Sequence, residues 1–287
     1  MCQVIPIVIM TRNENKFLKR CIDSIFENTK YPFHIYVIDN NSDDEEQKKI
    51  LNDYSEYNSI TIIRNNNNFW VLGLNKHLEY INKITQSKYF VLTDGDIEFN
   101  NYNCESCWLE KLVSFMEQYK CIGKIGLSLD WGLISNDHFY QEIYEQEKKL
   151  YNEEHKIGPL YISPVDTTAA IYRWDWSIDG YKFYPDHIRY LRPELYSCRT
   201  PREFMAEHHG WINYKEKIDK SKLGEKVKCF TLMGADLKKT QLNQIDARIK
   251  LFYLLLAKPM KILWGLRRRY YVLKYCLRKG TKKFVNH

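Results

Sequence analysis

Two aspartates follow an apolar stretch in the first half of the chain. Tyr89–Thr93 leads directly into Asp94, Gly95 and Asp96. A buried strand that ends there places both carboxylates at the carboxyl edge of a sheet, where open α/β folds bind ligands. Two carboxylates so placed repel each other unless a hard cation such as Mg²⁺ or Mn²⁺ lies between them and a phosphate. Gly95 is expected to let the backbone approach that phosphate closely. An isolated Asp-Gly-Asp is also a common turn, so the interpretation depends on what precedes it.

Three earlier apolar stretches are followed by polar residues in the same way. The expected strands are Val4–Met10, Phe33–Ile38, Ile60–Arg64 and Tyr89–Thr93. Thr11 and Asp39 come directly after the first two, and Asn67 lies in an asparagine run after the third. Because the carboxyl ends of parallel strands meet at one edge of a sheet, we expect these side chains to converge with Asp94. The spacing therefore predicts a nucleotide site.

Segments with helical periodicity separate these strands. One follows the polar loop that ends at Asn15, a second runs to about Tyr54 with Ser42 or Asp43 as its N-cap, and a third covers Trp70–Ile84. The first has Phe17, Leu18, Cys21, Ile22, Ile25 and Phe26 at helical spacing. This alternation predicts an α/β fold with a mostly parallel, Rossmann-like sheet flanked by helices. The chain has no Gly-x-Gly-x-x-Gly after the first strand and no Gly-Lys-Ser/Thr loop, which argues against dinucleotide and P-loop sites.

The pattern is less regular after Asp96. We expect helices over Trp108–Tyr119 and Ser135–His155, and strands over Ile122–Leu129 and Val165–Arg173. The predicted domains are a catalytic domain over residues 1–240, with a nucleotide-binding half at 1–100 and an acceptor and metal half at 101–240, and a tail at 241–287.

All of the excess positive charge lies in that tail. The chain has 43 Lys or Arg and 36 Asp or Glu, a formal net charge of +7. From Arg248 to His287 there are 12 basic residues and no acidic one, which leaves 31 basic against 36 acidic residues elsewhere. The distribution predicts that the tail meets an anionic surface while the body is neutral to acidic. It argues against nucleic acid as a partner of the body.

The tail has the composition of a helix that lies on a membrane. Leu251–Ala257 is too short to span a bilayer, and Lys258-Pro259 interrupts it. Met260–Leu277 mixes aliphatic and aromatic residues with Lys and Arg, which predicts a basic amphipathic helix in an anionic membrane interface. The alternative is a helix packed on the body or on another subunit. The chain starts without the features of a signal peptide, and we expect a cytoplasmic protein, peripheral on the inner face of the cell membrane.

Taken together, the motifs resemble those of GT-A fold glycosyltransferases similar to family 2, of the bacterial surface polysaccharide type. The resemblance covers roughly the first 215 residues. The segments that carry it are Val8–Glu14, Val37–Ser42, Asn67–Asn75 and Thr93–Asp96, with Ala206–Trp211 near the end. What it implies is a GT-A (nucleotide-diphospho-sugar transferase) fold and transfer of a sugar, with inversion, from a nucleotide-sugar donor, UDP-sugar by preference, to a glycan or lipid-linked acceptor.

The resemblance also implies roles for individual residues. The nucleotide-binding set comprises Thr11, Arg12, Glu14, Asp39, Asn67, Asn75 and Asp94. Within this set, Asp39 corresponds to the aspartate that pairs with the imide of a uracil-type base. Arg12 stands where many members have an aromatic residue, so guanidinium stacking replaces ring stacking. The cofactor is Mn²⁺ or Mg²⁺, and the metal ligands are Asp94, Asp96 and His208.

The general base of an inverting reaction has no clear motif, because the usual Glu-Asp pair is not recognisable. The catalytic candidates are Asp166, Asp186 and His209, and Asp166 is preferred because a strand can hold it rigidly. Plainer alternatives remain open. Asp166 could cap a turn, Asp39 could be an Asx-turn residue, and the two histidines could be ordinary interface residues. Trp174 and the aromatics that follow it could form a sugar platform or the small core of a lid.

Two other functions compete with a metal-dependent glycosyltransferase. One is a membrane-associated nucleotide-sugar-binding protein without catalysis, which the missing base motif keeps open. The other is a phosphatase with an aspartate nucleophile, which also places Asp-x-Asp after a strand. In such phosphatases the motif normally follows the first strand, whereas Asp94 and Asp96 follow the fourth.

Overall fold

A computed structural model describes residues 3–69, 74–100, 107–120, 122–165, 169–174, 197–215, 220–235, 237 and 239–279. These residues divide into two compact units. The first extends to Trp211, and the second begins at Ile212. The predicted domain boundary at residue 240 stays a prediction.

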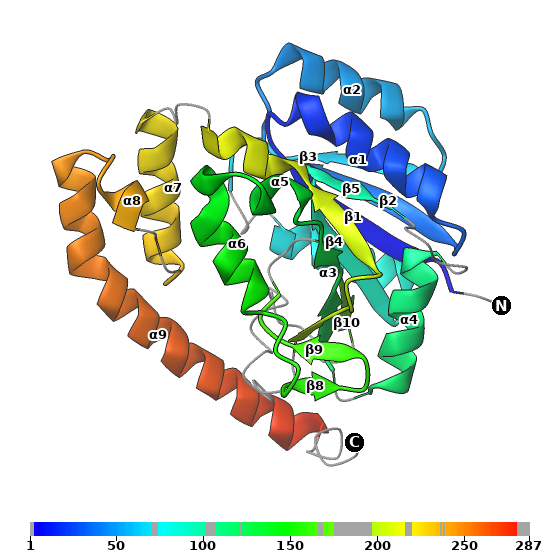
Figure 1. The fold of residues 1–287 in the computed structure, drawn as a ribbon. Coiled ribbons are helices and arrows are strands. Elements are labelled where there is room, and N and C mark those ends of the chain that lie inside the picture. Colours follow the sequence, from blue (N-terminus) through cyan, green and yellow to red (C-terminus); the bar gives the residue numbers. More distant parts are fainter. Residues whose placement is uncertain are drawn as a thin grey trace. The chain divides into compact units, whose positions relative to one another are not determined.

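The first unit is built on a mixed, mostly parallel sheet, which confirms the predicted α/β fold class (Figure 1). In the described residues its strand order is β3-β2-β1-β4-β10-β6-β11-β9-β8. The strands in that order are β3 (Ile60–Arg64), β2 (Phe33–Asp39), β1 (Ile5–Thr11), β4 (Tyr89–Asp94), β10 (Ala170–Arg173), β6 (Lys124–Gly126), β11 (Ser197–Arg199), β9 (Leu160–Ile162) and β8 (Lys156–Ile157). The first four are parallel, and β10 runs antiparallel to β4. All four carboxyl ends of the parallel strands therefore meet at one edge.

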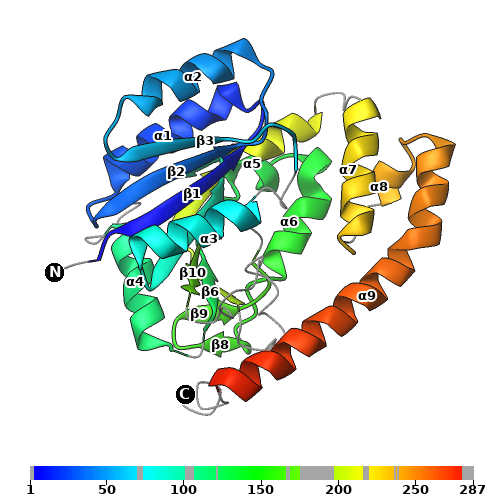
Figure 2. The same ribbon diagram turned by 180° about the vertical axis from the view of Figure 1, so that it is seen from behind.

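Helices cover both faces of this sheet (Figure 2). They are α1 (Asn15–Asn28), α2 (Glu45–Ser55), α3 (Leu74–Thr85) and α4 (Trp108–Gln118). Because side chains alternate along a strand, Ile7 and Ile9 of β1 pack in the core cluster that contains α1, α2 and α4 residues. Val8 points the other way, into the cluster formed with Leu78 and Ile81 of α3. The continuous apolar strand sequences follow from burial on both faces.

A three-stranded second sheet completes the first unit and positions the candidate site. Its order is β5 (Ile97–Phe99), β12 (Met205–His208) and β7 (Ser128–Leu129). In the antiparallel pairing of β12 with β5, His208 lies opposite Ile97 and Glu207 lies opposite Glu98. Residues more than a hundred positions apart are thus brought together next to Asp96. The remaining short elements are α5 (Gly132–Ser135), η2 (His138–Tyr140), α6 (Gln141–Lys148) and η5 (His209–Lys215).

Several expected elements differ from those observed. The helix expected over Ser135–His155 is replaced by α5, η2 and α6, because the Asp137 side chain accepts from the Phe139 amide and starts a new turn there. The strand expected over Ile122–Leu129 is divided between the two sheets as β6 and β7. The strand expected over Val165–Arg173 begins only at Ala170, since Ala169 has a φ of 45°, which is incompatible with a strand.

The N-cap of α2 is Asp44 and not Ser42 or Asp43. The Asp44 side chain accepts a hydrogen bond of 2.8 Å from the Gln47 amide. Ser42 and Asp43 are engaged elsewhere, because Ser42 binds Asp39 and Asp43 accepts from the Asn13 side chain. Trp174 is buried and stacked on Phe90 with 3.8 Å between ring centroids, so it belongs to the core and not to a sugar platform. The aromatics from 176 to 184 lie outside the described residues.

The second unit is helical. It consists of α7 (Lys220–Leu232), α8 (Lys239–Leu242) and α9 (Ala247–Lys279). The expected interruption at Lys258-Pro259 is wrong, since Pro259 lies inside the continuous helix α9. Trp264 of α9 donates its indole N–H to the Leu232 carbonyl at 2.7 Å. None of the helices in the described part of the chain combines the length and the apolar composition that crossing a bilayer requires.

Candidate active site

The predicted nucleotide-binding residues gather at the carboxyl edge of the parallel strands. In the β1–β2 pairing Thr11 lies directly opposite Asp39, and in the β1–β4 pairing Met10 lies opposite Asp94. Thr11, Asp39 and Asp94 therefore end three adjacent strands. The convergence expected from the sequence is found for these three residues, and that of Asn67 stays a prediction.

Asp39 is buried and shapes the loop that follows β2. Its Oδ2 accepts from the Ser42 amide at 3.2 Å, and its Oδ1 accepts from the Ser42 hydroxyl. Its backbone carbonyl accepts from the Asn65 amide at 2.8 Å, which ties the loop after β3 to β2. Asp39 thus has the Asx-turn contacts that the sequence left open. A carboxylate oxygen has two lone pairs, so these contacts are compatible with a further bond to a base.

Glu14 lies partly buried against the Asp94-Gly95-Asp96 turn. Its Oε2 accepts from the Thr11 hydroxyl at 3.0 Å, and it lies 2.7 Å from the point that a Cβ on Gly95 would occupy. The absence of a side chain at Gly95 therefore makes room for Glu14, and the approach of a phosphate to this backbone stays a prediction. Burial, Asp96 and Asp94, in that order, raise the pKa of Glu14 well above its ordinary value. Three carboxyl groups thus share one small volume.

Asp96 and His208 meet at Gly210. A Cβ on Gly210 would lie 1.9 Å from Asp96 Oδ2 and 3.0 Å from His208 Cε1, so the absent side chain leaves the space that both occupy. The His209 amide donates to the Asp96 carbonyl at 2.9 Å and fixes the two segments together. Asp96 Oδ1 and His208 Nδ1 are both buried, and within the described part of the chain neither has a hydrogen-bond partner. Carboxylate oxygen and imidazole nitrogen are suitable ligands for a divalent cation, so these two residues fit the predicted metal site.

A second group of possible metal ligands lies beside this site, where β12 pairs with β5. Glu98, Glu207 and His209 place one ligand atom each within 4.8 Å of the others, which is not true of the predicted trio of Asp94, Asp96 and His208. The group already has its counter-charge, however, because Arg20 forms an ion pair with Glu98. A guanidinium at that oxygen competes with a cation, so we interpret the group as an ion-pair network.

The structure describes three of the remaining predicted site residues, Arg12, Asn67 and Asn75, and does not describe two others. Arg12 Nε is buried without a partner, which leaves it available to a ligand. Asn67 is exposed in the loop after β3, and Asn75 lies near the start of α3. Asp166 and Asp186 lie outside the described residues, so their catalytic roles stay predictions.

The His209 side chain is held by contacts with Glu98 and Phe17. Its Nε2 bonds to Glu98 at 2.7 Å, and its ring stacks on Phe17 of α1 at 5.8 Å between centroids. Its proton-accepting role stays a prediction.

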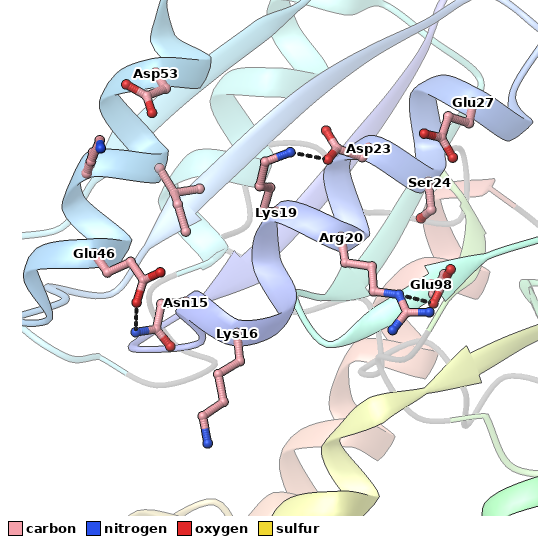
Figure 3. A pocket seen from close by; sticks show the side chains of 12 residues that line it. Asn15, Lys16, Lys19, Arg20, Asp23, Ser24, Glu27, Glu46, Asp53 and Glu98 are labelled. Carbon is pink, nitrogen blue, oxygen red and sulfur yellow. Dashed lines mark hydrogen bonds and ion pairs between the residues drawn. The ribbon is translucent and has the colours of Figure 1, made fainter.

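A pocket of about 660 Å³ lies between α1, α2 and β5 (Figure 3). It contains none of the predicted donor or metal residues. Two ion pairs lie within it, Lys19 with Asp23 and Arg20 with Glu98. We therefore interpret it as a solvated groove at the back of the Glu98 network.

Sequence reasoning missed the residues that hold the site together. Gln47 accepts from the Glu14 amide at 2.7 Å and donates to the Thr11 hydroxyl at 2.9 Å. Arg20 and Glu98 support His209. A polar Gln47 on the apolar face of an expected helix was the available signal for the first. Nothing in the sequence pairs Arg20 with Glu98.

The chain belongs to glycosyl transferase family 2. The model of that family matches residues 7–173, more than half of the chain. This match covers the acid motif after β4 but ends before His208. It makes the chain a nucleotide-sugar-dependent glycosyltransferase and goes against the phosphatase alternative. No curated protein matches the chain by sequence.

Several solved structures are similar to this chain at low sequence identity. The mannosyltransferase PcManGT from Pyrobaculum calidifontis, in complex with GDP-Man and Mn²⁺, has a TM-score of 0.54 and 13% identity, over 98% of this chain and 82% of that one. GalNAc-T7 with UDP, GalNAc and Mn²⁺ has a TM-score of 0.48 and 16% identity, over 80% and 48%. S. aureus TarS 1-349 has a TM-score of 0.46 and 13% identity, over 88% and 71%. At such identity the likeness to PcManGT establishes the GT-A fold alone.

Proposed function

We propose that the protein is a metal-dependent hexosyltransferase that moves a sugar, with inversion, from a UDP-sugar to a glycan or lipid-linked acceptor in surface polysaccharide biosynthesis. The family match supports the reaction class. The Mn²⁺ bound by PcManGT supports a divalent cation, and Asp39 is the residue on which the preference for uracil rests.

One observation carries this proposal. Arg12 Nε, Asp96 Oδ1 and His208 Nδ1 are buried at or near one edge of the sheet and have no hydrogen-bond partner among the residues that the structure describes. A buried polar group without a hydrogen bond costs about 1–3 kcal/mol, so a fold seldom keeps such groups unless a ligand uses them. A divalent cation would supply a partner to Asp96 Oδ1 and to His208 Nδ1, and a bound nucleotide would supply one to Arg12 Nε.

The residues of the chain have distinct tasks in the proposed reaction. Arg12 and the buried Asp39 loop bind the nucleoside and hold it in the orientation that the sheet edge defines. Asp96 and His208, with Asp94 beside them, hold the cation, which when bound acts as a Lewis acid toward the leaving diphosphate. Glu14 and Gln47 keep Thr11 and the acid turn in place.

The acceptor hydroxyl must lose a proton on the face opposite the leaving group. Asp166 is the proposed base, with Asp186 and His209 as the other candidates. We place the reaction at the inner face of the cell membrane, because the basic tail suits an anionic surface.

The test is slow hydrolysis of nucleotide sugars by the purified protein. We expect release of free sugar from a UDP-sugar with Mn²⁺, and none with EDTA. GDP-sugars serve as the comparison for the base. A protein that binds UDP-sugars but releases no sugar from any of them with any divalent cation would be a binding protein and not a transferase.

A further inference from the structure

Helix α9 presents a row of large apolar side chains to solvent. Eighteen large hydrophobic residues are exposed in the described part of the chain, and half of them lie on this helix. They are Leu251, Leu254, Leu255, Ile262, Leu263, Leu266, Tyr270, Leu273 and Leu277. Their side chains are 56% to 78% exposed. A continuous exposed apolar surface of this kind marks an interaction site.

The exposed row occupies one side of the helix. The residues at its centre are Leu251, Leu255, Ile262, Leu266 and Leu273, which at 100° per residue fall within an arc of roughly 60°. Ile249 and Trp264 lie on the other side, and they contact α7. Ile249 lies 2.6 Å from the point that a Cβ on Gly224 would occupy, and Trp264 bonds to the Leu232 carbonyl. The face that α7 covers is therefore not the face with the apolar row.

Cations stand on the same exposed side. Arg248, Lys258 and Arg269 are exposed, and the helical periodicity places them within or at the border of the apolar row. In total α9 contains ten Lys or Arg and no Asp or Glu. Lys and Arg at such positions can lay their aliphatic stems along apolar groups while their charged ends reach anionic headgroups.

The charge also decides between a membrane and a second copy of the chain. A symmetric dimer through this face would bring the same patch from two copies together. Arg248, Lys258 and Arg269 of each copy would then meet the same three cations of the other, with no acidic residue on the facing helix. An anionic lipid surface instead neutralises these cations and takes up the leucines among its acyl chains.

We propose that this side of α9, the lipid face, lies in the headgroup region of a membrane that contains anionic lipids, with the helix axis parallel to the bilayer. A helix of 33 residues extends over about 50 Å, so several lipids contact it at once. The lipid face keeps the enzyme on the surface that holds a lipid-linked acceptor. That consequence rests on the proposed function, whereas membrane binding itself requires neither donor nor cation.

Sedimentation of the full chain with vesicles tests the proposal without any substrate. We expect binding to vesicles that contain phosphatidylglycerol and at least about tenfold weaker binding to phosphatidylcholine alone, with a decrease as salt rises. The variant Leu255→Gln/Ile262→Gln/Leu266→Gln removes the apolar centre, and Arg248→Gln/Lys258→Gln/Arg269→Gln removes cations from the same face. Each is expected to weaken binding about tenfold or more.

A matched control separates the face from net charge. Lys30, Lys49 and Lys120 are exposed on the first unit, and Lys30→Gln/Lys49→Gln/Lys120→Gln changes the net charge as much as the cationic variant does. Its vesicle binding should stay within about twofold of the unchanged chain. Equal loss in this control would overturn the lipid face, as would unchanged binding in both α9 variants. A dimer that the apolar variant converts to monomers, with vesicle binding unchanged, would assign the face to a second copy instead.

Discussion

His209 Nε2 lies 2.7 Å from Glu98 Oε2, and both side chains are largely buried, at 13% and 18% exposure. The same Glu98 pairs with Arg20 of α1. This contact fixes His209, which directly follows His208 in the chain. The backbone amide of His209 in turn donates to the Asp96 carbonyl. We infer that the network of Arg20, Glu98 and His209 positions the two proposed metal ligands, Asp96 and His208.

Replacing Glu98 with Gln should weaken metal binding without unfolding the protein. The change removes the charge that Arg20 and His209 share, and residues that support metal ligands typically contribute about 10-fold to 100-fold in affinity. Titration of Mn²⁺ followed by electron paramagnetic resonance measures the effect. Glu27→Gln, in the same groove, is the control and should leave the affinity unchanged. Equal Mn²⁺ affinity in Glu98→Gln and the unchanged protein would show that the network has no positioning role.

Gly210→Ala should displace Asp96. The added Cβ would lie 1.9 Å from Asp96 Oδ2, and the short side chain must rotate away from His208 to avoid it. We expect Mn²⁺ affinity to fall about tenfold or more while the circular dichroism spectrum is retained. Gly265→Ala in α9 is the control, because nothing lies within 4 Å of its added Cβ. Tight Mn²⁺ binding by Gly210→Ala would contradict the assignment of Asp96 as a ligand.

Glu14→Gln should stabilise the metal-free protein at neutral pH. Because the pKa of Glu14 is raised in the fold, its ionisation costs more there than in the unfolded chain. The unchanged protein therefore loses stability relative to Glu14→Gln as pH rises above the ordinary value of 4.5 toward the raised value. We expect a gain in Tm of about 2–4 °C at pH 8, corresponding to about 1 kcal/mol, and a smaller gain at pH 4. If Glu14→Gln and the unchanged protein gave the same Tm at both pH values, the raised pKa of Glu14 would be contradicted.

Asp39→Asn tests whether this carboxylate reads the base or only shapes its loop. If it accepts from a uracil imide, the change should weaken UDP binding about tenfold and leave GDP binding unaltered. Ser42→Ala is the matched variant, because it removes a loop bond to Asp39 and leaves the carboxylate. Calorimetry of both nucleotides gives the comparison. Equal losses in the two variants would assign Asp39 to the loop alone.

The N-terminal strands and the edge where they meet follow directly from the sequence. The apolar runs before Thr11, Asp39 and Asp94 have no solvent-exposed face, and parallel packing leaves one place for their polar ends. The strand register then confirms the convergence. Local pattern is sufficient for β1 and β2 because each is followed by a helix, α1 or α2, that packs on the sheet.

The rest of the site depends on distant pairings that local pattern does not encode. His208 reaches Asp96 through the pairing of β12 with β5, two strands of four and three residues without clear periodicity. The N-cap of α2 was expected at Ser42 or Asp43, and Asp44 takes that role because Asp39 and Asn13 engage the other two. Competition among adjacent polar residues is decided by tertiary contacts.

Calorimetric titration of UDP, with Mn²⁺ and with EDTA, is the most direct test of a cation held by Asp96 and His208 against a diphosphate. The unchanged protein should bind UDP at least about tenfold more tightly with Mn²⁺, a difference of about 1.4 kcal/mol. Asp96→Asn and His208→Ala should each remove this dependence. UDP affinity that is equal with Mn²⁺ and EDTA, or a dependence that survives in both variants, would contradict the central claim.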